Sequence, residues 1–262
     1  MNTIRLRSTA KKFTVINISK NKVDKDVQRI LFPFTLMRIV SMTPRYRIKD
    51  DIIQPNTIHS YIISFLGTML FVLAFVFRYI KFLSIVIIGE TPFMFFVTHM
   101  DIIFYSMAFI VNFLTGLLQT KNLIEFVLIF QGVHRFINSK RVSESYIVWN
   151  WVCLSIECTL YFFIYPMMSI YVGMEFIMFA IGCLLIIFDF NEIYAIRVLK
   201  LLETKIGLWS REVLKGQDIE SSGRDYNRKL FQAYVNILKC YDIHKHGIQY
   251  FALHFLFLVL IH

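Results

Sequence analysis

The chain has 262 residues, of which 56% are hydrophobic and 16% aromatic, and its formal net charge is +10. A mean hydropathy of +0.57 lies far above the range of soluble globular proteins and predicts an integral membrane protein. That prediction argues against the nucleic-acid-binding class, which a charge of +10 would indicate in a soluble chain. The basic start of the chain has no apolar centre or small-residue cleavage site, so no signal peptide is expected.

Four charge-poor apolar segments are long enough to predict helices that cross a bilayer, which takes about 20 residues. A fifth begins near Gly247, is too short to cross, and predicts that the chain is incomplete at its C-terminus. The expected fold class is therefore an all-α membrane bundle, with a cytoplasmic segment over 1–59 and a transmembrane domain over 60–262. The expected spans are 60–77, 102–118, 146–168, 170–188 and the truncated 247–262.

Two connections between these spans are predicted on the outer side. The apolar stretch 82–97 contains Gly89, Glu90 and Pro92, which indicate an outer loop or a re-entrant segment rather than a further helix. Between the third and fourth spans, a very tight turn is expected around Pro166 to Gly173.

The distribution of basic residues predicts the orientation of the chain. Lys and Arg number 12 in residues 1–59, 4 in 119–145 and 10 in 197–245, but 2 in 78–100 and none in 166–175. Because basic loops are retained in the cytoplasm, the N-terminus, the 119–145 loop and the segment 189–246 are expected to face inward. The four cysteines fit no recognisable pairing, and free thiols are expected.

Two stripes of apolar residues in the 189–246 segment recur at helical spacing. The first starts at Ile193 on a helix that continues out of the fourth span, with Lys200, Glu203 and Lys205 on its other faces. Packing within the chain and contact with a second subunit both explain such stripes, and the residues alone leave the two open. The candidate interface or anchor residues are Ile196, Leu199, Leu202, Ile206, Trp209, Phe231, Tyr234, Leu238 and Tyr241.

Three segments of the chain resemble insect, specifically lepidopteran, gustatory receptors. They are residues 33–39 (PFTLMRI), 43–48 (TPRYRI) and 234–245 (YVNILKCYDIHK), the last at the entry to the fifth helix. The resemblance extends over nearly the whole chain. It implies a seven-helix chemoreceptor of the plasma membrane with a cytoplasmic N-terminus, which agrees with the orientation predicted from charge.

What this resemblance implies is a subunit of a tetrameric, ligand-gated cation channel that detects a tastant such as a sugar or a bitter compound. It implies a homo- or hetero-tetramer in the lipid bilayer, joined by a cytoplasmic anchor, with no cofactor and no nucleic acid. The family's pore helix carries a Thr-Tyr…Gln-Phe signature that this sequence lacks. The alternatives are a truncated, non-conducting subunit that modulates full-length receptors, and the product of a decaying gene.

The resemblance also places the tastant pocket among helices two to six, in the outer half of the membrane. Ligand pockets are mostly apolar with a few oriented polar groups, and tyrosine serves both purposes. For each aromatic residue the competing interpretation is ordinary helix packing. The candidates are Asp101, Tyr105, Glu157, Thr159, Tyr161, Phe162, Tyr165, Glu175 and Phe179.

Glu157 is the most conspicuous of these candidates because it lies near the middle of the third span. A carboxylate at that depth costs about 2–3 kcal/mol or more unless it is paired, protonated or in water. It is expected to contact a ligand or a polar neighbour in the bundle. A structural pairing with a hydroxyl or amide, such as that of Asn112, is the competing interpretation.

Other functional classes find less support in the sequence. No nucleophile elbow, phosphate-binding glycine loop or metal-ligand spacing is present, so neither an enzyme nor a metal site is predicted. The His244-Lys245-His246 run indicates an exposed polar turn. A G-protein-coupled receptor would have the opposite orientation, and no internal repeat indicates a transporter.

Overall fold

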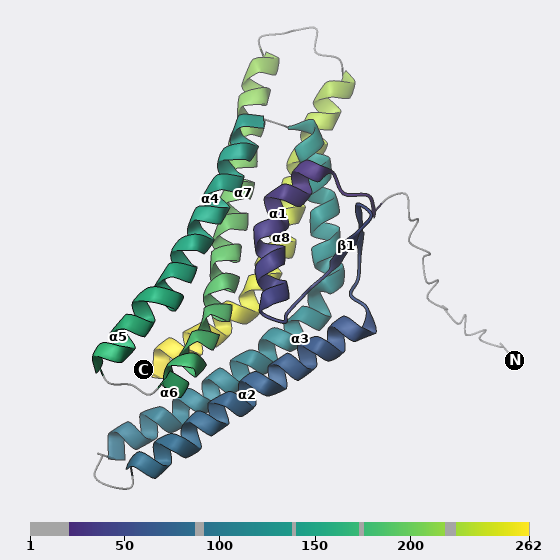
Figure 1. Ribbon diagram of the computed structural model, residues 1–262. Helices are drawn as coiled ribbons and strands as arrows, with labels where there is room; N and C mark the ends of the chain where they lie inside the picture. The colour runs from purple at the N-terminus through teal and green to yellow at the C-terminus, as the bar shows by residue number, and fades with distance from the viewer. Residues whose placement is uncertain (1–20, 87–91, 138–139, 173–175, 218–223, 262) are drawn as a thin grey trace, which may run out of the picture.

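The computed structural model describes residues 21–86, 92–137, 140–172, 176–217 and 224–261, which are almost entirely helical apart from one small hairpin (Figure 1). The all-α class predicted from the sequence is confirmed for this part of the chain. The elements are α1 Lys25–Val40, β1 Arg47–Lys49, β2 Ile52–Gln54, α2 Ile58–Val86, α3 Pro92–Phe136, α4 Lys140–Thr159, the π-helix η2 Leu160–Ile164, α5 Tyr165–Val172, α6 Phe176–Gly182, the 3-10 turn η3 Cys183–Leu185, α7 Ile186–Gln217 and α8 Arg224–Ile261.

Four helical segments are long and apolar enough to cross a membrane: Ile58–Lys81, Ile102–Phe136, Val142–Met167 and Phe179–Lys215. Each overlaps one of the four complete spans expected from the sequence. In the most apolar stretch of each segment only 11% to 28% of the residues are buried within the fold, which suits helices that face lipid. The chain is thus a multi-pass membrane protein by the length and composition of its helices. The predicted fifth segment continues α8 without a break to Ile261.

The prediction of an outer loop or re-entrant segment over 82–97 is wrong at both ends. Residues 82–86 continue α2, and α3 begins at Pro92; residues 87–91, with Gly89 and Glu90, lie outside the described part. Proline is tolerated at the first position of a helix because the amide it lacks would have no partner there. Pro92 therefore starts a helix instead of breaking one.

The tight turn predicted around Pro166 is also misplaced, because the helix continues through this proline to Val172. The π-helix η2 ends two residues before Pro166. A proline removes one backbone hydrogen bond, and a local change of hydrogen-bond register lets a helix continue past the gap. The fourth span correspondingly begins later than expected, with α6 at Phe176 rather than at residue 170.

The two ends of the long helix α3 belong to different parts of the molecule. Its first half lies along α2, and its second half runs beside α1 and α8 (Figure 1). Two separate hydrophobic cores result. We call the one between α2, α3, α4 and α7 the span core, with Phe75, Phe109, Leu154 and Ile187 buried in it.

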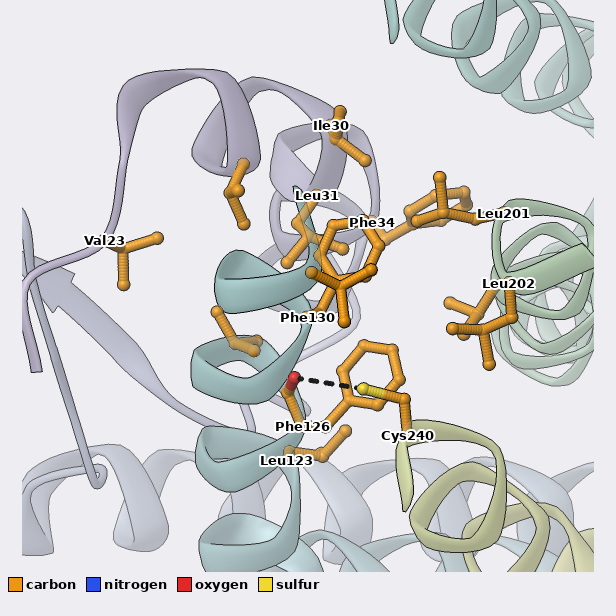
Figure 2. Close-up of a cluster of buried hydrophobic side chains, with 14 of the residues drawn as sticks. Val23, Ile30, Leu31, Phe34, Leu123, Phe126, Phe130, Leu201, Leu202 and Cys240 are labelled. Atoms are coloured by element: carbon orange, nitrogen blue, oxygen red, sulfur yellow. Dashed lines mark hydrogen bonds between the residues drawn. The ribbon is translucent and has the colours of Figure 1, made fainter. Parts of the chain in front are cut away.

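The second core, the bundle core, joins α1 and the later parts of α3, α7 and α8 (Figure 2). Ile30, Phe130 and Ile237 are fully buried there. The Cys240 thiol lies 3.9 Å from the carbonyl oxygen of Phe126, and burial raises the pKa of this thiol to about 12. The described parts of the segment 189–246 thus bury one face of α7 and one face of α8 against their own chain.

The N-terminal segment is attached to the bundle by polar contacts with α3. Gln131 accepts a hydrogen bond from the Asp24 amide at 3.0 Å and donates one to the Lys22 carbonyl at 2.9 Å. Arg135 donates to both carboxylate oxygens of Asp24, at 2.6 and 2.8 Å, which lowers the pKa of that carboxyl. The β1–β2 hairpin turns at Asp50 and Asp51, both at positive φ, as a tight two-residue turn requires.

Helix α7 continues from the fourth span as a rod, as predicted, but its buried face differs from the predicted stripe. Tyr194, Val198, Leu201 and Leu202 face the core. Lys205, which was expected on another face, is only 2% exposed. Its ammonium donates to the Ile137 carbonyl at 2.8 Å and lies 3.0 Å from His134 Nδ1, so hydrogen bonds replace the water it loses.

Candidate functional site

A polar cluster lies where α4 faces α7 within the membrane-spanning part. Glu157 is half-buried, and its carboxyl group lies near the Asp189 carboxyl. The Tyr161 hydroxyl, one helical turn after Glu157, donates a hydrogen bond to Asp189 Oδ2. An ionised carboxylate can only accept hydrogen bonds, and the Tyr161 hydroxyl supplies one to Asp189. This cluster can therefore present polar groups to a ligand.

The local backbone explains why Tyr161 reaches Asp189. Tyr161 belongs to the π-helix η2, in which one extra residue per turn shifts the side chains relative to an α-helix. Opposite it, Cys183 is the first residue of the 3-10 turn η3, and its thiol lies 3.7 Å from the Tyr161 carbonyl oxygen. Irregular turns thus face each other on the two helices that carry the cluster. Single π-helical turns are frequent at functional sites, and a 3-10 stretch within a helix often marks a hinge or a strained segment.

Aromatic rings form one side of this region. Tyr105 on α3 packs against Phe75 with ring centroids 5.5 Å apart and against Phe188 at 6.5 Å. Phe109 lies 4.8 Å from Phe188. These rings belong to or border the span core, so Tyr105 serves packing and also lies near the polar cluster.

Two further predicted residues, Tyr165 and Phe179, lie together. Their ring centroids are 5.3 Å apart, and Tyr165 lies 6.3 Å from Tyr161. Gly182 permits this arrangement, because a Cβ atom on it would come within 2.7 Å of the Tyr165 hydroxyl. The structure thus brings Tyr105, Glu157, Tyr161, Tyr165 and Phe179 into one neighbourhood.

The remaining predicted pocket residues do not join them. Phe162 is 58% exposed and points out of the helix packing. Thr159 is also exposed, and its hydroxyl bonds to the Ser155 carbonyl of its own helix at 2.8 Å. The side chain of Asp101 and the whole of Glu175 lie outside the described residues.

Asp189 is the residue of this cluster that no pattern in the sequence indicated. It directly follows the predicted fourth span, where a charged residue is ordinary, so its position gave no signal. The suggested pairing of Glu157 with Asn112 is not found: Asn112 Oδ1 accepts a hydrogen bond from Asn191 at 3.4 Å, and Glu157 faces Asp189. A helical wheel for 176–217 would have placed Asp189 on the face shared with Ile186 and Phe190.

The predicted anchor residues divide into two groups. Leu202 is 2% exposed, and Trp209 stacks on Tyr234 at 4.7 Å, so these three pack within the chain. The others have much of their surface uncovered: Ile196, Leu199, Ile206, Phe231, Leu238 and Tyr241.

Comparison with known proteins does not assign this chain to a family. No family model, no curated protein and no solved structure matches this chain. Among the residues described, no group of three or more His, Cys, Asp or Glu side chains is placed to hold a metal ion.

Proposed function

We propose that this chain is a subunit of a ligand-gated cation channel of the insect gustatory receptor family. It lies in the plasma membrane of chemosensory neurons with its N-terminus in the cytoplasm. It needs no cofactor and has no enzymatic activity of its own. The support comes from the sequence resemblance, from the four apolar helices, and above all from an uncovered apolar face on α8.

Helix α8 has two apolar faces in the bundle. One is buried and contains Leu230, Ala233, Ile237 and Cys240. The other is exposed: Phe231 is 65% exposed, Leu238 41% and Tyr241 45%. A solvated helix needs only one apolar face to pack into its own fold, so the second face favours contact with another protein chain.

A subunit contact explains this second face best because α7 offers a similar surface beside it. Ile196, Leu199 and Ile206 are 57%, 38% and 39% exposed, and α7 and α8 pack together. A rotationally symmetric assembly would cover the same surface on every copy. These faces support a contact between subunits, and the number of four subunits is what the resemblance implies.

The oligomeric state tests the assembly. Native mass spectrometry of the purified protein in detergent is expected to show a tetramer. Replacing Phe231 and Leu238 together by Ser should shift the population to monomers. Replacing Ile62 and Leu66 by Ser is the control, because these residues are also exposed and apolar but lie on the membrane-spanning helix α2. A purely monomeric wild-type protein would contradict the proposed assembly.

We place the ligand contacts at Glu157, Tyr161, Asp189 and Tyr105. The test is the tastant-evoked current or calcium signal of cells that express the complete reading frame of the gene. Glu157→Gln and Glu157→Leu should alter the ligand response while surface expression of the Gln variant is preserved. If both variants leave the response and the surface level unchanged, this location of the pocket is wrong.

The channel mechanism has an independent test in the transcript. The resemblance implies two further apolar spans and the Thr-Tyr…Gln-Phe signature beyond the codon for His262. A long transcript read across that codon is expected to show both. A stop codon at that point would favour the alternative of a non-conducting subunit or a decaying gene.

A further inference from the structure

Helix α1 has a second face besides the one that packs into the bundle core. Its members lie at helical spacing along α1, the first two basic and the others apolar: Lys25, Arg29, Phe32, Leu36, Ile39 and Val40. We call this face the α1 stripe. Phe32, Ile39 and Val40 are 53%, 58% and 67% exposed. A helix that packs on its own fold in water needs only one apolar face, so this second one indicates a further contact.

The apolar end of the α1 stripe lies beside the membrane-spanning helix α2. Met42 follows two residues after the end of α1, and a Cβ atom on Gly67 would come within 2.9 Å of its Cβ and Sδ atoms. Gly67 lies nine residues after the start of α2 at Ile58, about 14 Å along the helix axis. The hydrocarbon part of a bilayer is about 30 Å thick, so this contact lies at the depth of the acyl chains.

The turn that follows α1 is held between two spanning helices, near the place where α2 and α3 run together (Figure 1). Thr43 and Pro44 line a small cleft there with Ser64 of α2 and Gly116 of α3. The cleft has room for about one water molecule. The turn therefore packs closely on both helices at this level.

The backbone of this turn meets the condition for non-helical chain at membrane depth, which is that its polar groups have partners within the protein. The amides of Ser41, Met42 and Thr43 donate to carbonyl oxygens near the end of α1, at 2.8, 3.0 and 2.8 Å. Pro44 has no amide hydrogen, and its carbonyl oxygen accepts a hydrogen bond from Asn56 Nδ2. The turn can thus lie among acyl chains without losing backbone hydrogen bonds to water.

A third spanning helix, α4, gives the level of the middle of the stripe. Phe32 packs on Trp151 of α4 with ring centroids 6.2 Å apart. Trp151 belongs to the apolar segment Val142–Met167, and its neighbour Trp149 is 56% exposed. Tryptophan is enriched where the headgroups meet the acyl chains. Phe32 therefore lies near this boundary, which is also where the stripe changes from basic to apolar residues.

The basic end of the stripe suits the headgroup region. Lys25 and Arg29 are both exposed and lie one helical turn apart, where like charges repel each other. A lipid phosphate beside them reduces this repulsion, and long basic side chains at a bilayer extend towards its headgroups.

We propose that the α1 stripe is a lipid-binding surface in the leaflet nearest the N-terminus. Phe32, Ile39 and Val40 contact acyl chains, and Lys25 and Arg29 contact lipid phosphates. Residues 32–44 thereby belong to the membrane domain and not to the cytoplasmic segment over 1–59 that the sequence predicted. The proposal goes beyond the channel function and does not depend on it, since it requires only that α2 and α4 cross a bilayer.

Photolabelling of the full chain in lipid nanodiscs tests the proposal. The probe is a phosphatidylcholine with a diazirine in one acyl chain, and mass spectrometry locates the labelled residues. Label is expected on Ile39 and Val40 at the level found on Leu66 of α2, which is 59% exposed. Leu214 is the internal control, because it is 60% exposed but lies at the far end of α7 and should carry little label. Label as strong on Lys25 and Arg29 as on Ile39 would contradict the proposed boundary.

Hydroxyl radicals generated in the surrounding water should give the reverse pattern. They are expected to oxidise Leu214 and to spare Ile39 and Val40. Oxidation of these two residues without lipid label would place the stripe in water and overturn the proposal. Protection from both reagents would mean that a second copy of the chain covers the stripe, which would overturn it as well.

A pair of variants provides an independent measurement. Val40→Asp places a carboxylate among acyl chains, where it is costly, and should lower the unfolding temperature in nanodiscs by several degrees. Leu214→Asp is the matched control, since Leu214 is similarly exposed and also lies in the last turn of its helix, so the helix dipole acts on both substitutions alike. It should change the unfolding temperature little. Equal unfolding temperatures for the two variants would show that Val40 does not contact lipid.

Discussion

At the scale of the residue, Glu157 shows what can be anticipated for a buried charge. Its position in an apolar helix predicted that it needs a partner, because an isolated carboxylate in a membrane is costly. The partner itself, Asp189, follows from the rotation of α7 against α4 and is 32 positions away in the chain. Lys205 is the opposite case: its burial depends on acceptors from α3 and the turn after it, which no local pattern shows.

Tyr161→Phe is expected to destabilise the protein, because it removes the hydrogen bond to Asp189. A hydrogen bond to an ionisable group contributes about 1.5–3 kcal/mol to the free energy of unfolding. Thermal unfolding in detergent would measure the loss. Tyr171→Phe is the control, since Tyr171 is 89% exposed and should unfold at the wild-type temperature. Equal unfolding temperatures for both variants would show that the bond contributes nothing.

His244 predicts a pH dependence of stability. Its pKa is lowered to about 4 in the fold, chiefly by burial, and returns to about 6.5 on unfolding. The fold therefore favours the neutral imidazole of His244. This preference adds fully to the free energy of unfolding above pH 6.5, and the added stability is lost as the pH falls towards 4. The loss amounts to ~3 kcal/mol.

Chemical unfolding at pH 7 and pH 4.5 would measure this dependence. His244→Gln cannot titrate and should lose that part of the difference between the two pH values. The same pH dependence in the variant and the wild-type protein would assign the effect to other groups, such as Asp24, whose pKa is lowered mainly by its hydrogen bond to Arg135.

At the scale of the element, helix positions were predicted better than helix ends. Proline accounts for both main errors: Pro92 begins a helix, and Pro166 lies inside one beside the π-helix η2. A proline's effect depends on whether its missing amide had a partner, and that is decided by the turn around it. The spacing of apolar residues correctly predicted the long rod of α7. The predicted stripe, however, is rotated by part of a turn from the face that is buried.

Trp209→Ala is expected to loosen the end of the α7–α8 pair. Trp209 stacks on Tyr234 at 4.7 Å and donates a hydrogen bond to the Leu230 carbonyl at 2.8 Å. Loss of an aromatic pair and of one hydrogen bond costs about 2 kcal/mol. Amide hydrogen exchange should become faster in 205–215 and 228–236.

Trp149→Ala provides the control for this substitution. Trp149 is 56% exposed on α4 and makes little contact to lose. Its exchange pattern in α7 and α8 should match the wild-type protein. Unchanged exchange in the Trp209 variant would show that other contacts hold the two helices together.

At the scale of the whole molecule, two hydrophobic cores occur in one chain. The bundle core lies along the second half of α3, past the part of this helix that contacts α2. The span core, in contrast, is surrounded by exposed apolar residues. Urea weakens the burial of apolar and peptide groups from water. It should therefore unfold the bundle core while helices in detergent remain folded.

Hydrogen exchange at increasing urea concentration would separate the two cores. Amides near Phe130 and Ile237 are expected to lose protection at lower urea than amides near Phe75 and Phe109. Simultaneous loss at all four places would show that α3 and α7 couple the cores into one cooperative unit.

Apolar length and periodicity are local properties of the chain, so the membrane class, the approximate places of four spans and the helical continuation of the fourth were predictable from the amino-acid residues alone. The proximity of Asp189 to Glu157, the burial of Lys205 and the position of Gly116 beside a cleft near Arg45 were not. These facts depend on how the helices are rotated and crossed. Rotation and crossing come from the packing of side chains that lie far apart in sequence.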